Sequence, residues 1–209
     1  MDFFSYLWKA PQLEPRPSMD TQLIGKRLTL RMGDPADWRA WRYLRDMSRD
    51  FLIPWEPQWS HKSLDYNFFC GVLRRNWREW RHGKAYAFYI FLQDQENAKG
   101  AFLGCINLND VQYGIARKAT LGYWIGKPYA GQGYMTEASQ LVCDFAFDAL
   151  KLHRVEASCL PHNEPSKALL KRLGFDEEGY AKEYLQINGR WEDHLLWGKV
   201  RPSSHSPCL

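Results

Sequence analysis

The chain has 209 residues and a formal net charge of +4, with 45% apolar and 15% aromatic residues. This length predicts a single domain with a sizeable core. No apolar run approaches the roughly 20 residues that a helix needs to cross a bilayer, which excludes a membrane-spanning protein. The apolar N-terminus, Met1–Trp8, lacks the basic region and the long apolar region of a signal peptide. We therefore expect a cytoplasmic protein that does not bind membranes.

The cysteines indicate the redox state. Five of them occur, widely spaced and without a C-x-x-C pair: Cys70, Cys105, Cys143, Cys159 and Cys208. An odd number without paired spacing is not typical of a disulfide framework or of a zinc site. We expect reduced, mostly buried thiols and no bound metal.

Excess positive charge lies entirely in the N-terminal half. Residues 1–100 contain 16 Lys and Arg against 12 Asp and Glu, whereas residues 101–209 contain 12 of each. Such charge, when it recurs at helical spacing, usually marks a solvated helix face, and the alternative is docking onto a polyanion such as ribosomal RNA. Two stripes have this spacing: Arg39, Arg42, Arg45 and Arg49, and then Arg74, Arg78 and Arg81.

The first predicted elements are a strand and two helices. Arg27–Met32 alternates apolar with polar residues, which is the period of a strand. Asp34 can cap the following helix, with Pro35 in its first turn. Phe51–Trp59, rich in Pro and Trp, is predicted to be a loop. A second amphipathic helix follows over 63–82, and its core-facing stripe contains Phe68, Phe69, Val72, Leu73, Trp77 and Trp80.

An antiparallel meander is predicted next. A polar turn over Asp94–Gly100 joins its first two strands, and all three are bounded by turn-forming residues. The strands are Ala85–Leu92, Phe102–Val111 and Ala119–Ile125.

The period then changes to that of a helix, whose apolar face extends from Met135 to Ala149. A closing hairpin is expected to turn at Asn188-Gly189, a pair that favours tight hairpin turns. The tail, residues 201–209, is predicted to be disordered. The remaining elements are a strand over Arg154–Cys159, a helix over Pro165–Leu173 ended by Gly174, and the hairpin strands Tyr180–Ile187 and Trp191–Val200.

A glycine loop, Gly131-Gln132-Gly133, separates the meander from this helix. Glycines at such a place let backbone N–H groups approach a phosphate at a helix N-terminus. A dinucleotide-binding Rossmann unit is a poor alternative, because its third glycine would fall at Thr136, and no Gly-Lys-Ser/Thr follows as in a P-loop. By itself the motif is equally compatible with a structural turn. The order meander, glycine loop, helix, strand, helix favours a pyrophosphate-binding site.

Several stretches of the chain carry a resemblance to a known family: Phe51–Pro57, Leu121–Gly126, Gly131–Ala138, Pro161–Ser166, Leu173–Phe175, Glu178–Lys182 and Trp191–His194. With them the sequence resembles the GNAT family of N-acetyltransferases over nearly the whole chain, and in particular its RimJ-type members, which acetylate ribosomal-protein alanine. One departure is Pro128, where the family usually has Gln or Arg three places before the first glycine.

This resemblance implies the GNAT fold, of the α+β class, with three layers: a central, mixed and mostly antiparallel sheet of about seven strands flanked by helices. Residues 1–20 would be a partly disordered leader, 21–200 the acetyltransferase domain and 201–209 a disordered tail. It also implies acetyl-CoA as co-substrate, without a metal.

The resemblance further implies roles for individual residues. Backbone groups of Tyr123, Trp124 and Ile125 would pair with the pantetheine arm as an added strand, and one N–H group would stabilise developing negative charge. Asn163 would hydrogen-bond pantetheine, or would serve only as a helix N-cap. Ser166 would bind the cofactor and protonate the departing thiolate. The glycine loop with its flank would bind the pyrophosphate: Gly131, Gln132, Gly133, Tyr134 and Met135.

The acceptor is expected to be a peptide α-amine. Its ordinary pKa of roughly 8 leaves a sizeable neutral fraction, so that one carboxylate suffices as base. Glu183 matches the position of the glutamate proposed as base in RimL-like relatives, and Glu56 is the second candidate. Trp55 and Tyr184 would pack on the peptide. An ordinary solvated strand glutamate is an equally good interpretation of Glu183.

The leading hypothesis is therefore acetylation of the N-terminal Ala or Ser of a ribosomal protein, by a monomer or homodimer. Two alternatives remain open: a GNAT enzyme that acetylates a small-molecule amine, and a catalytically silent module that binds acetyl-CoA or RNA. Asn163 and Ser166 beside an intact glycine loop favour an enzyme over a pure RNA binder, which has no need for that combination.

Overall fold

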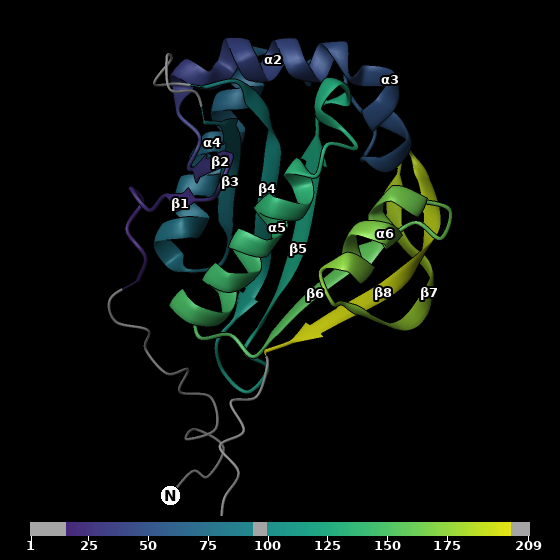
Figure 1. The fold of residues 1–209 in the computed structure, drawn as a ribbon. Coiled ribbons are helices and arrows are strands. Elements are labelled where there is room, and N and C mark those ends of the chain that lie inside the picture. Colours follow the sequence, from purple (N-terminus) through teal and green to yellow (C-terminus); the bar gives the residue numbers. More distant parts are fainter. Residues whose placement is uncertain (1–15, 94–99, 202–209) are drawn as a thin grey trace, which may run out of the picture.

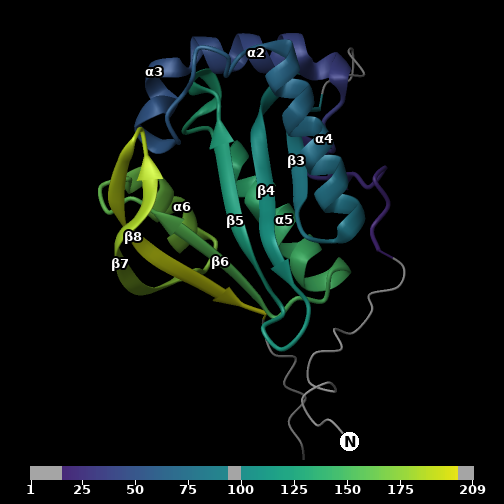
Figure 2. The same ribbon diagram turned by 180° about the vertical axis from the view of Figure 1, so that it is seen from behind.

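The computed structural model of the chain describes residues 16–93 and 100–201. Within these ranges one sheet lies between two layers of helices (Figures 1 and 2). Most of the predicted leader and of the polar turn after residue 93, and all but the first residue of the predicted tail, lie outside the described residues. Among those that are described, no helix combines the length and the apolar character needed to span a membrane.

The sheet has eight strands in the order β1-β2-β3-β4-β5-β6-β8-β7, and every neighbouring pair is antiparallel except β5 and β6. The predicted meander and closing hairpin are confirmed. The sequence indicated about seven strands because β1 has only two residues, too few to show a period. The strands are β1 (Leu23–Ile24), β2 (Leu28–Arg31), β3 (Tyr86–Leu92), β4 (Phe102–Gln112), β5 (Lys118–Ile125), β6 (Arg154–Cys159), β7 (Asp176–Ile187) and β8 (Arg190–Val200).

Helices cover both faces of the sheet. Figure 1 shows α5 and α6 in front of it, and Figure 2 shows α4 on the opposite face, with α2 across one end. The helices are α2 (Trp38–Met47), α3 (Arg49–Leu52), α4 (Tyr66–His82), α5 (Tyr134–Asp144) and α6 (Glu164–Arg172). The shorter turns are 3-10 turns η1 (Pro35–Asp37), η2 (Ile53–Trp55) and η3 (Lys127–Tyr129), and a π turn η4 (Phe145–Ala149).

Local signals in the sequence set several element ends. Asp34 accepts a hydrogen bond from the Ala36 N–H group at 2.8 Å, and Asp37 accepts one from the Asp34 N–H group at 2.8 Å, which is a capping box. The predicted cap at Asp34 is confirmed. Asn188 and Gly189 have φ values of 45° and 82°, as a hairpin turn with two positive φ angles requires.

Two expectations for the N-terminal half were wrong. The segment Phe51–Trp59 is partly helical, because α3 extends to Leu52 and η2 continues it, with Pro54 in the first turn of η2, where a missing N–H group costs nothing. Phe68 is 44% exposed and does not lie in the core. Each residue of an α-helix turns the side chain by about 100°, so that Phe69, fully buried, carries the core stripe in its place.

The core has two parts, one on each face of the sheet. Alternating residues of β3 divide between them: Phe88 and Ile90 belong to the larger cluster under α5, whereas Tyr89 and Phe91 belong to the smaller cluster under α2 and α4. This alternation is the period of two that the strand imposes. Because both faces are covered, β3 reads as a continuous apolar run rather than an alternating one.

The strands β5 and β6 separate after a short parallel contact. They pair only from Lys118–Thr120 to Arg154–Glu156, after which β6 continues against β8 and β5 continues against β4. Figures 1 and 2 show the two strands diverging toward the end of the sheet where α3 lies. The second half of β5 therefore has an edge that no described strand covers, beside the glycine loop and α6.

We predict that Phe69→Ala lowers the free energy of unfolding by about 3 to 5 kcal/mol, because the ring is fully buried between Trp41 and Tyr89. The adjacent variant Phe68→Ala is the matched control and should change stability by no more than about 0.5 kcal/mol. Urea denaturation followed by circular dichroism measures both. Equal losses for the two variants would contradict the placement of the core stripe.

Candidate active site

A cavity of about 410 Å³ occupies the gap where β5 and β6 separate. Its walls come from four places: the end of β5, the glycine loop with the start of α5, the first turns of α6, and the segment from α3 to η2. The lining residues are Phe51, Leu52, Trp55, Glu56, Tyr123, Trp124, Ile125, Tyr129, Ala130, Gly131, Gly133, Tyr134, Met135, Thr136, Asn163, Pro165, Ser166, Ala168, Leu169 and Arg172.

The glycine loop presents backbone groups to this cavity. Gly131 and Gly133 have φ values of 74° and 80°, which residues with a side chain rarely adopt, and no atom lies within 4 Å of the position of a Cβ atom at Gly131. Gly133 is the N-cap of α5, and no side chain of the described residues caps that end. The first N–H groups of α5 are therefore free to bind an anion, and the helix dipole favours one there.

Arg27, which directly precedes β2, holds the glycine loop in place, a role that the sequence does not indicate. Its Nη1 donates to the Gln132 carbonyl at 3.1 Å, its Nε donates to Glu137 Oε2 at 3.0 Å, and its guanidinium lies 4.4 Å from the Tyr134 ring centroid. No local pattern of the chain predicts this contact, because Arg27 and Glu137 are 110 residues apart.

A hydrogen bond between Gln132 and Pro128 stabilises the conformation of the loop. The Gln132 Nε2 donates to the Pro128 carbonyl at 2.7 Å. Pro128 itself lies in η3, where its missing N–H group is not needed. The side chain of Gln132 is therefore used within the loop, and Pro128 supplies a carbonyl group rather than the long polar side chain that the family usually has at this position.

The Glu137 carboxyl is ionised at neutral pH. Burial raises its pKa, but hydrogen bonds from the Arg27 backbone and side chain outweigh burial, so that the net pKa lies below the ordinary value of 4.5. The Arg27 N–H group donates to Glu137 Oε1 at 2.8 Å. One carboxylate thus ties the beginning of β2 to the first turn of α5.

Two hydroxyl groups meet at the floor of the cavity. The Tyr123 Oη and the Ser166 Oγ are 2.7 Å apart, and either can donate to the other. Burial raises the pKa of Tyr123 to about 12, although its hydrogen bond with Ser166 acts in the opposite direction. Tyr123 therefore carries its proton at neutral pH. The sequence predicts only a backbone role for Tyr123, and it contains no signal for this hydroxyl pair because the two residues are 43 positions apart.

Asn163 caps α6, which is one of the two interpretations that the sequence left open. Its Oδ1 accepts a hydrogen bond from the Ser166 N–H group at 3.2 Å. It also lines the cavity, and for its amide nitrogen no hydrogen-bond partner occurs among the described residues. An asparagine amide has two N–H donors, so that Asn163 can cap the helix and still donate to a ligand.

The far wall of the cavity contains an ion pair between Arg45 and Glu56. The Arg45 Nη2 donates to Glu56 Oε2 at 2.5 Å and its Nη1 donates to Oε1 at 3.2 Å, while Trp59 Nε1 donates to Oε2 at 2.7 Å. The arginine guanidinium also lies 4.8 Å from the Trp124 ring centroid. These contacts hold the Glu56 carboxylate in one orientation.

The predicted site residues do not all meet there. Trp55 lines the cavity, and its ring centroid lies 5.5 Å from that of His162. The closing hairpin approaches this wall through the Asn188 N–H group, which donates to the Glu56 carbonyl at 2.9 Å.

Glu183 and Tyr184 are exposed on a bulge of β7 and are not part of the lining. Among the described lining residues, Arg172 on α6 is the one cation.

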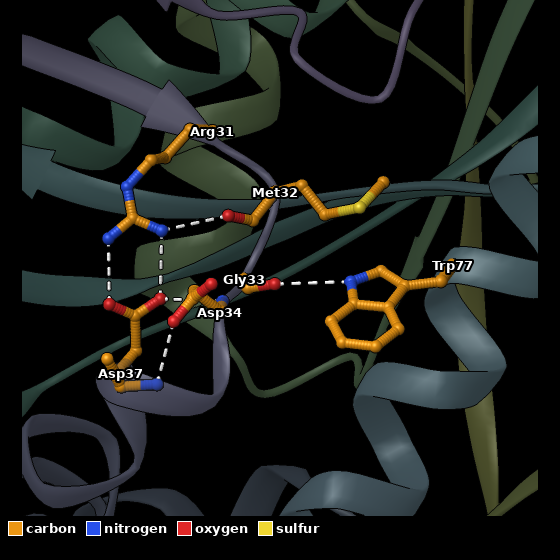
Figure 3. Close-up of polar contacts among 7 residues, drawn as sticks. Arg31, Met32, Gly33, Asp34, Asp37 and Trp77 are labelled. Atoms are coloured by element: carbon orange, nitrogen blue, oxygen red, sulfur yellow. Dashed lines mark hydrogen bonds and ion pairs between the residues drawn. The ribbon is translucent and has the colours of Figure 1, made fainter.

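A second cavity, of about 440 Å³, lies beside the end of β2, where residues 19–22 and Trp77 of α4 also line it. Figure 3 shows that its polar groups bind one another: Arg31 Nη2 and Nη1 donate to the Asp37 carboxylate at 2.7 and 2.8 Å. Trp77 Nε1 donates to the Gly33 carbonyl at 3.2 Å. Because these donors and acceptors bind one another, the residues stabilise the turn between β2 and η1. They leave no free polar group of this set for a ligand or a reaction.

Comparisons with known proteins agree with this geometry. The sequence pattern of the acetyltransferase (GNAT) domain matches residues 27–176. The chain is 34% identical to the ribosomal protein uS5-alanine N-acetyltransferase of Escherichia coli over 182 residues, which cover 87% of this chain and 91% of that protein. It is 33% identical to the probable N-acetyltransferase YjcK of Bacillus subtilis over 184 residues, covering 86% and 97%.

Solved structures of acetyltransferases also superpose on this chain. RimJ of Mycobacterium smegmatis, in complex with CoA-disulfide, superposes with a TM-score of 0.81 at 32% identity, covering 88% of this chain and 90% of that one. The ribosomal-protein-S5-alanine acetyltransferase of Vibrio fischeri superposes with a TM-score of 0.79 at 29% identity, covering 88% and 98%. The predicted fold, α+β with a mixed and mostly antiparallel sheet, is confirmed.

We predict that Glu137→Gln destabilises the protein at neutral pH but not in acid. Because the folded-state pKa of Glu137 lies below 4.5, its ionised form stabilises the fold above that pH, and this contribution is lost as the pH falls through the folded-state pKa. The gap in denaturation midpoint between wild type and variant should therefore narrow as the pH falls below 4.5 and through the folded-state pKa. Glu177→Gln, an exposed glutamate without an ion pair among the described residues, is the control. A gap that persists in acid would contradict this linkage.

Proposed function

The chain belongs to the GNAT family of acetyltransferases, and we propose that it transfers the acetyl group of acetyl-CoA to the N-terminal α-amine of a ribosomal protein. The observation that carries this proposal is the hydroxyl pair of Tyr123 and Ser166, at the floor of the cavity between the diverging strands and beside an open glycine loop. The relatives named for acetylation of ribosomal protein uS5 and for ribosomal-protein-serine acetylation support the acceptor class.

The residues present fit acetyl-CoA. The glycine loop and the first N–H groups of α5 would hold phosphate groups, since nothing fills the space at Gly131 and the helix dipole favours an anion. The uncovered edge of β5, through backbone groups of Tyr123, Trp124 and Ile125, would bind an extended chain as an added strand. The Asn163 amide would donate to it. Arg172 would add the positive charge that Pro128 lacks.

When bound, acetyl-CoA supplies a thioester carbonyl that an amine can attack, with the thiolate of coenzyme A as leaving group. Ser166 Oγ would give a proton to the departing sulfur, and Tyr123 Oη would replace that proton through the 2.7 Å hydrogen bond. The proton that the amine loses would return to Tyr123 through solvent, so that both hydroxyl groups are restored at the end of the turnover. Burial raises the pKa of Tyr123 to about 12, so that its proton is present at neutral pH when the thiolate departs. Backbone N–H groups at the end of β5 would stabilise negative charge on the carbonyl oxygen.

The amine must lose a proton, and Glu56 is the better placed of the two candidate bases. Glu56 lines the cavity, and its carboxylate is oriented by Arg45 and Trp59. Glu183 is exposed on the β7 bulge, and its N–H group donates to Asp193 Oδ1 at 2.8 Å. We therefore assign Glu56 as the group that receives the proton, directly or through a water molecule. Trp55, from the same wall, would pack against the first residue of the acceptor.

A peptide α-amine suits this single carboxylate. Its ordinary pKa is about 2 to 3 units below that of a lysine side chain, so that far more of it is neutral near pH 7. The protein should therefore acetylate N-termini and modify lysine ε-amines slowly.

We predict that a short peptide with an N-terminal Ala or Ser and no Lys is acetylated, whereas a peptide with a blocked N-terminus and one Lys is modified at least about tenfold more slowly. Mass spectrometry after incubation with acetyl-CoA measures both. Acetylation of the blocked peptide alone would overturn the α-amine assignment. Modification of neither peptide, with acetyl-CoA bound, would favour a small-molecule acceptor or a silent binding module.

We predict that Ser166→Ala lowers kcat by about 10- to 100-fold with little change in acetyl-CoA affinity, because protonation of the thiolate matters in the transition state and not in the ground state. Tyr123→Phe should lower kcat by a smaller factor, since Ser166 can then draw its proton from water. Steady-state kinetics and calorimetry separate the two effects. A Ser166 variant with wild-type kcat would leave this residue only its place in the first turn of α6.

A further inference from the structure

We propose that the exposed face of α4 is a docking surface for the phosphate backbone of RNA. This inference rests on the proposed function, because a ribosomal protein as acceptor brings RNA close to the enzyme. We call this surface the α4 basic face. It consists of four exposed arginines of α4 and of Lys84, which lies two residues after the helix: Arg74, Arg75, Arg78, Arg81 and Lys84.

The net charge of the molecule is concentrated in this segment. Residues 66–84 contain these five cations and a single acidic residue, Glu79, a net charge of +4. The whole chain of 209 residues has a net charge of +4 as well, so that the charges of all other residues cancel. A surface that holds the entire charge excess attracts a polyanion and orients it.

The cations of this face are available to a partner. All five are exposed, and Arg78 makes an ion pair with Glu79 at 3.1 Å while its side chain remains 62% exposed. Within residues 16–93 and 100–201, no carboxylate lies within ion-pair distance of Arg74, Arg75 or Arg81. Arg16 adds a further cation beside them, because its Nη1 donates to the Arg81 carbonyl at 2.7 Å.

The other arginine stripe of the sequence is used differently. Arg45 lies in the ion pair with Glu56 and is only 12% exposed, Arg49 pairs with Asp46 at 2.9 Å, and Arg42 lies over the Trp38 ring. The sequence treated both stripes alike. The structure separates them, since Arg45 and Arg49 bind carboxylates of the protein, whereas Arg74, Arg75 and Arg81 have no such partner among the described residues.

RNA fits this face better than a membrane does. A helix that lies on a membrane inserts an apolar face, but the apolar face of α4 is buried against the sheet, with Phe69, Leu73 and Trp80 no more than 1% exposed. Arginine binds phosphate through two parallel hydrogen bonds, and four of the five cations are arginines. The helix α4 also lies on the side of the sheet opposite α5, as Figure 2 shows, so that RNA bound to it would not compete for the glycine loop.

The test uses the full chain and a fluorescein-labelled RNA hairpin, with fluorescence anisotropy at several salt concentrations. The double variant Arg74→Gln/Arg78→Gln should bind the hairpin at least about tenfold more weakly and should reduce the slope of log affinity against log salt by about 1 to 2. The double variant Arg39→Gln/Arg42→Gln, which removes the same charge from α2, should stay within about threefold of wild type. Excess coenzyme A should not displace the hairpin.

Three outcomes would overturn the proposal: equal weakening by the two double variants, displacement of the hairpin by coenzyme A, or stronger binding to vesicles of anionic lipid than to RNA. Acetylation of a short free peptide should be the same for both variants and wild type, which shows that the site is intact. If no peptide is acetylated by any of the proteins, the proposed function fails while the RNA measurement still decides on the α4 basic face.

Discussion

The early separation of β5 from β6 is the constraint on which the site depends. Parallel pairing ends after three residues of each strand, which leaves backbone groups at the end of β5 without a partner strand among the described residues. Unpaired backbone groups next to an apolar core need a ligand or water. Both strands lead directly into the walls of the opening: β5 into the glycine loop and α5, and β6 into the cap of α6. One interruption of the sheet thus brings the loop, the hydroxyl pair and Asn163 together.

A buried ion pair stabilises the wall of the cavity that α3 and η2 form. Arg45 and Glu56 are 12% and 16% exposed, and such charges are tolerated in the interior only when they are paired and hydrogen-bonded. Arg45 Nε has no hydrogen-bond partner among the described residues, and the faces of Trp59 and Trp124 partly compensate for this. Removing either partner leaves an unpaired charge against the cavity wall. The pair thereby links α2 to the segment that carries Trp55.

The sequence by itself determined the features that depend on near neighbours in the chain. The period of two in the meander, the Asp34 cap and the Asn188-Gly189 turn follow from local geometry, and all are found. The glycine loop at the start of a helix was equally local. The resemblance to a family added the positions of Asn163 and Ser166. In contrast, Phe68 and Phe69 are adjacent aromatics that composition does not distinguish, and the packing of α4 against the sheet decides that Phe69 is the buried one.

Only the tertiary structure decided which side chains meet. Tyr123 with Ser166, Arg27 with Glu137 and Arg45 with Glu56 are contacts between elements that pack side by side, and no periodicity of the chain encodes them. It also separated two candidates that sequence made equivalent, since Glu56 lines the cavity whereas Glu183 is exposed. The physical reason is that a charge or hydroxyl acquires its role from burial and partners, and both are properties of the packed fold rather than of neighbouring residues.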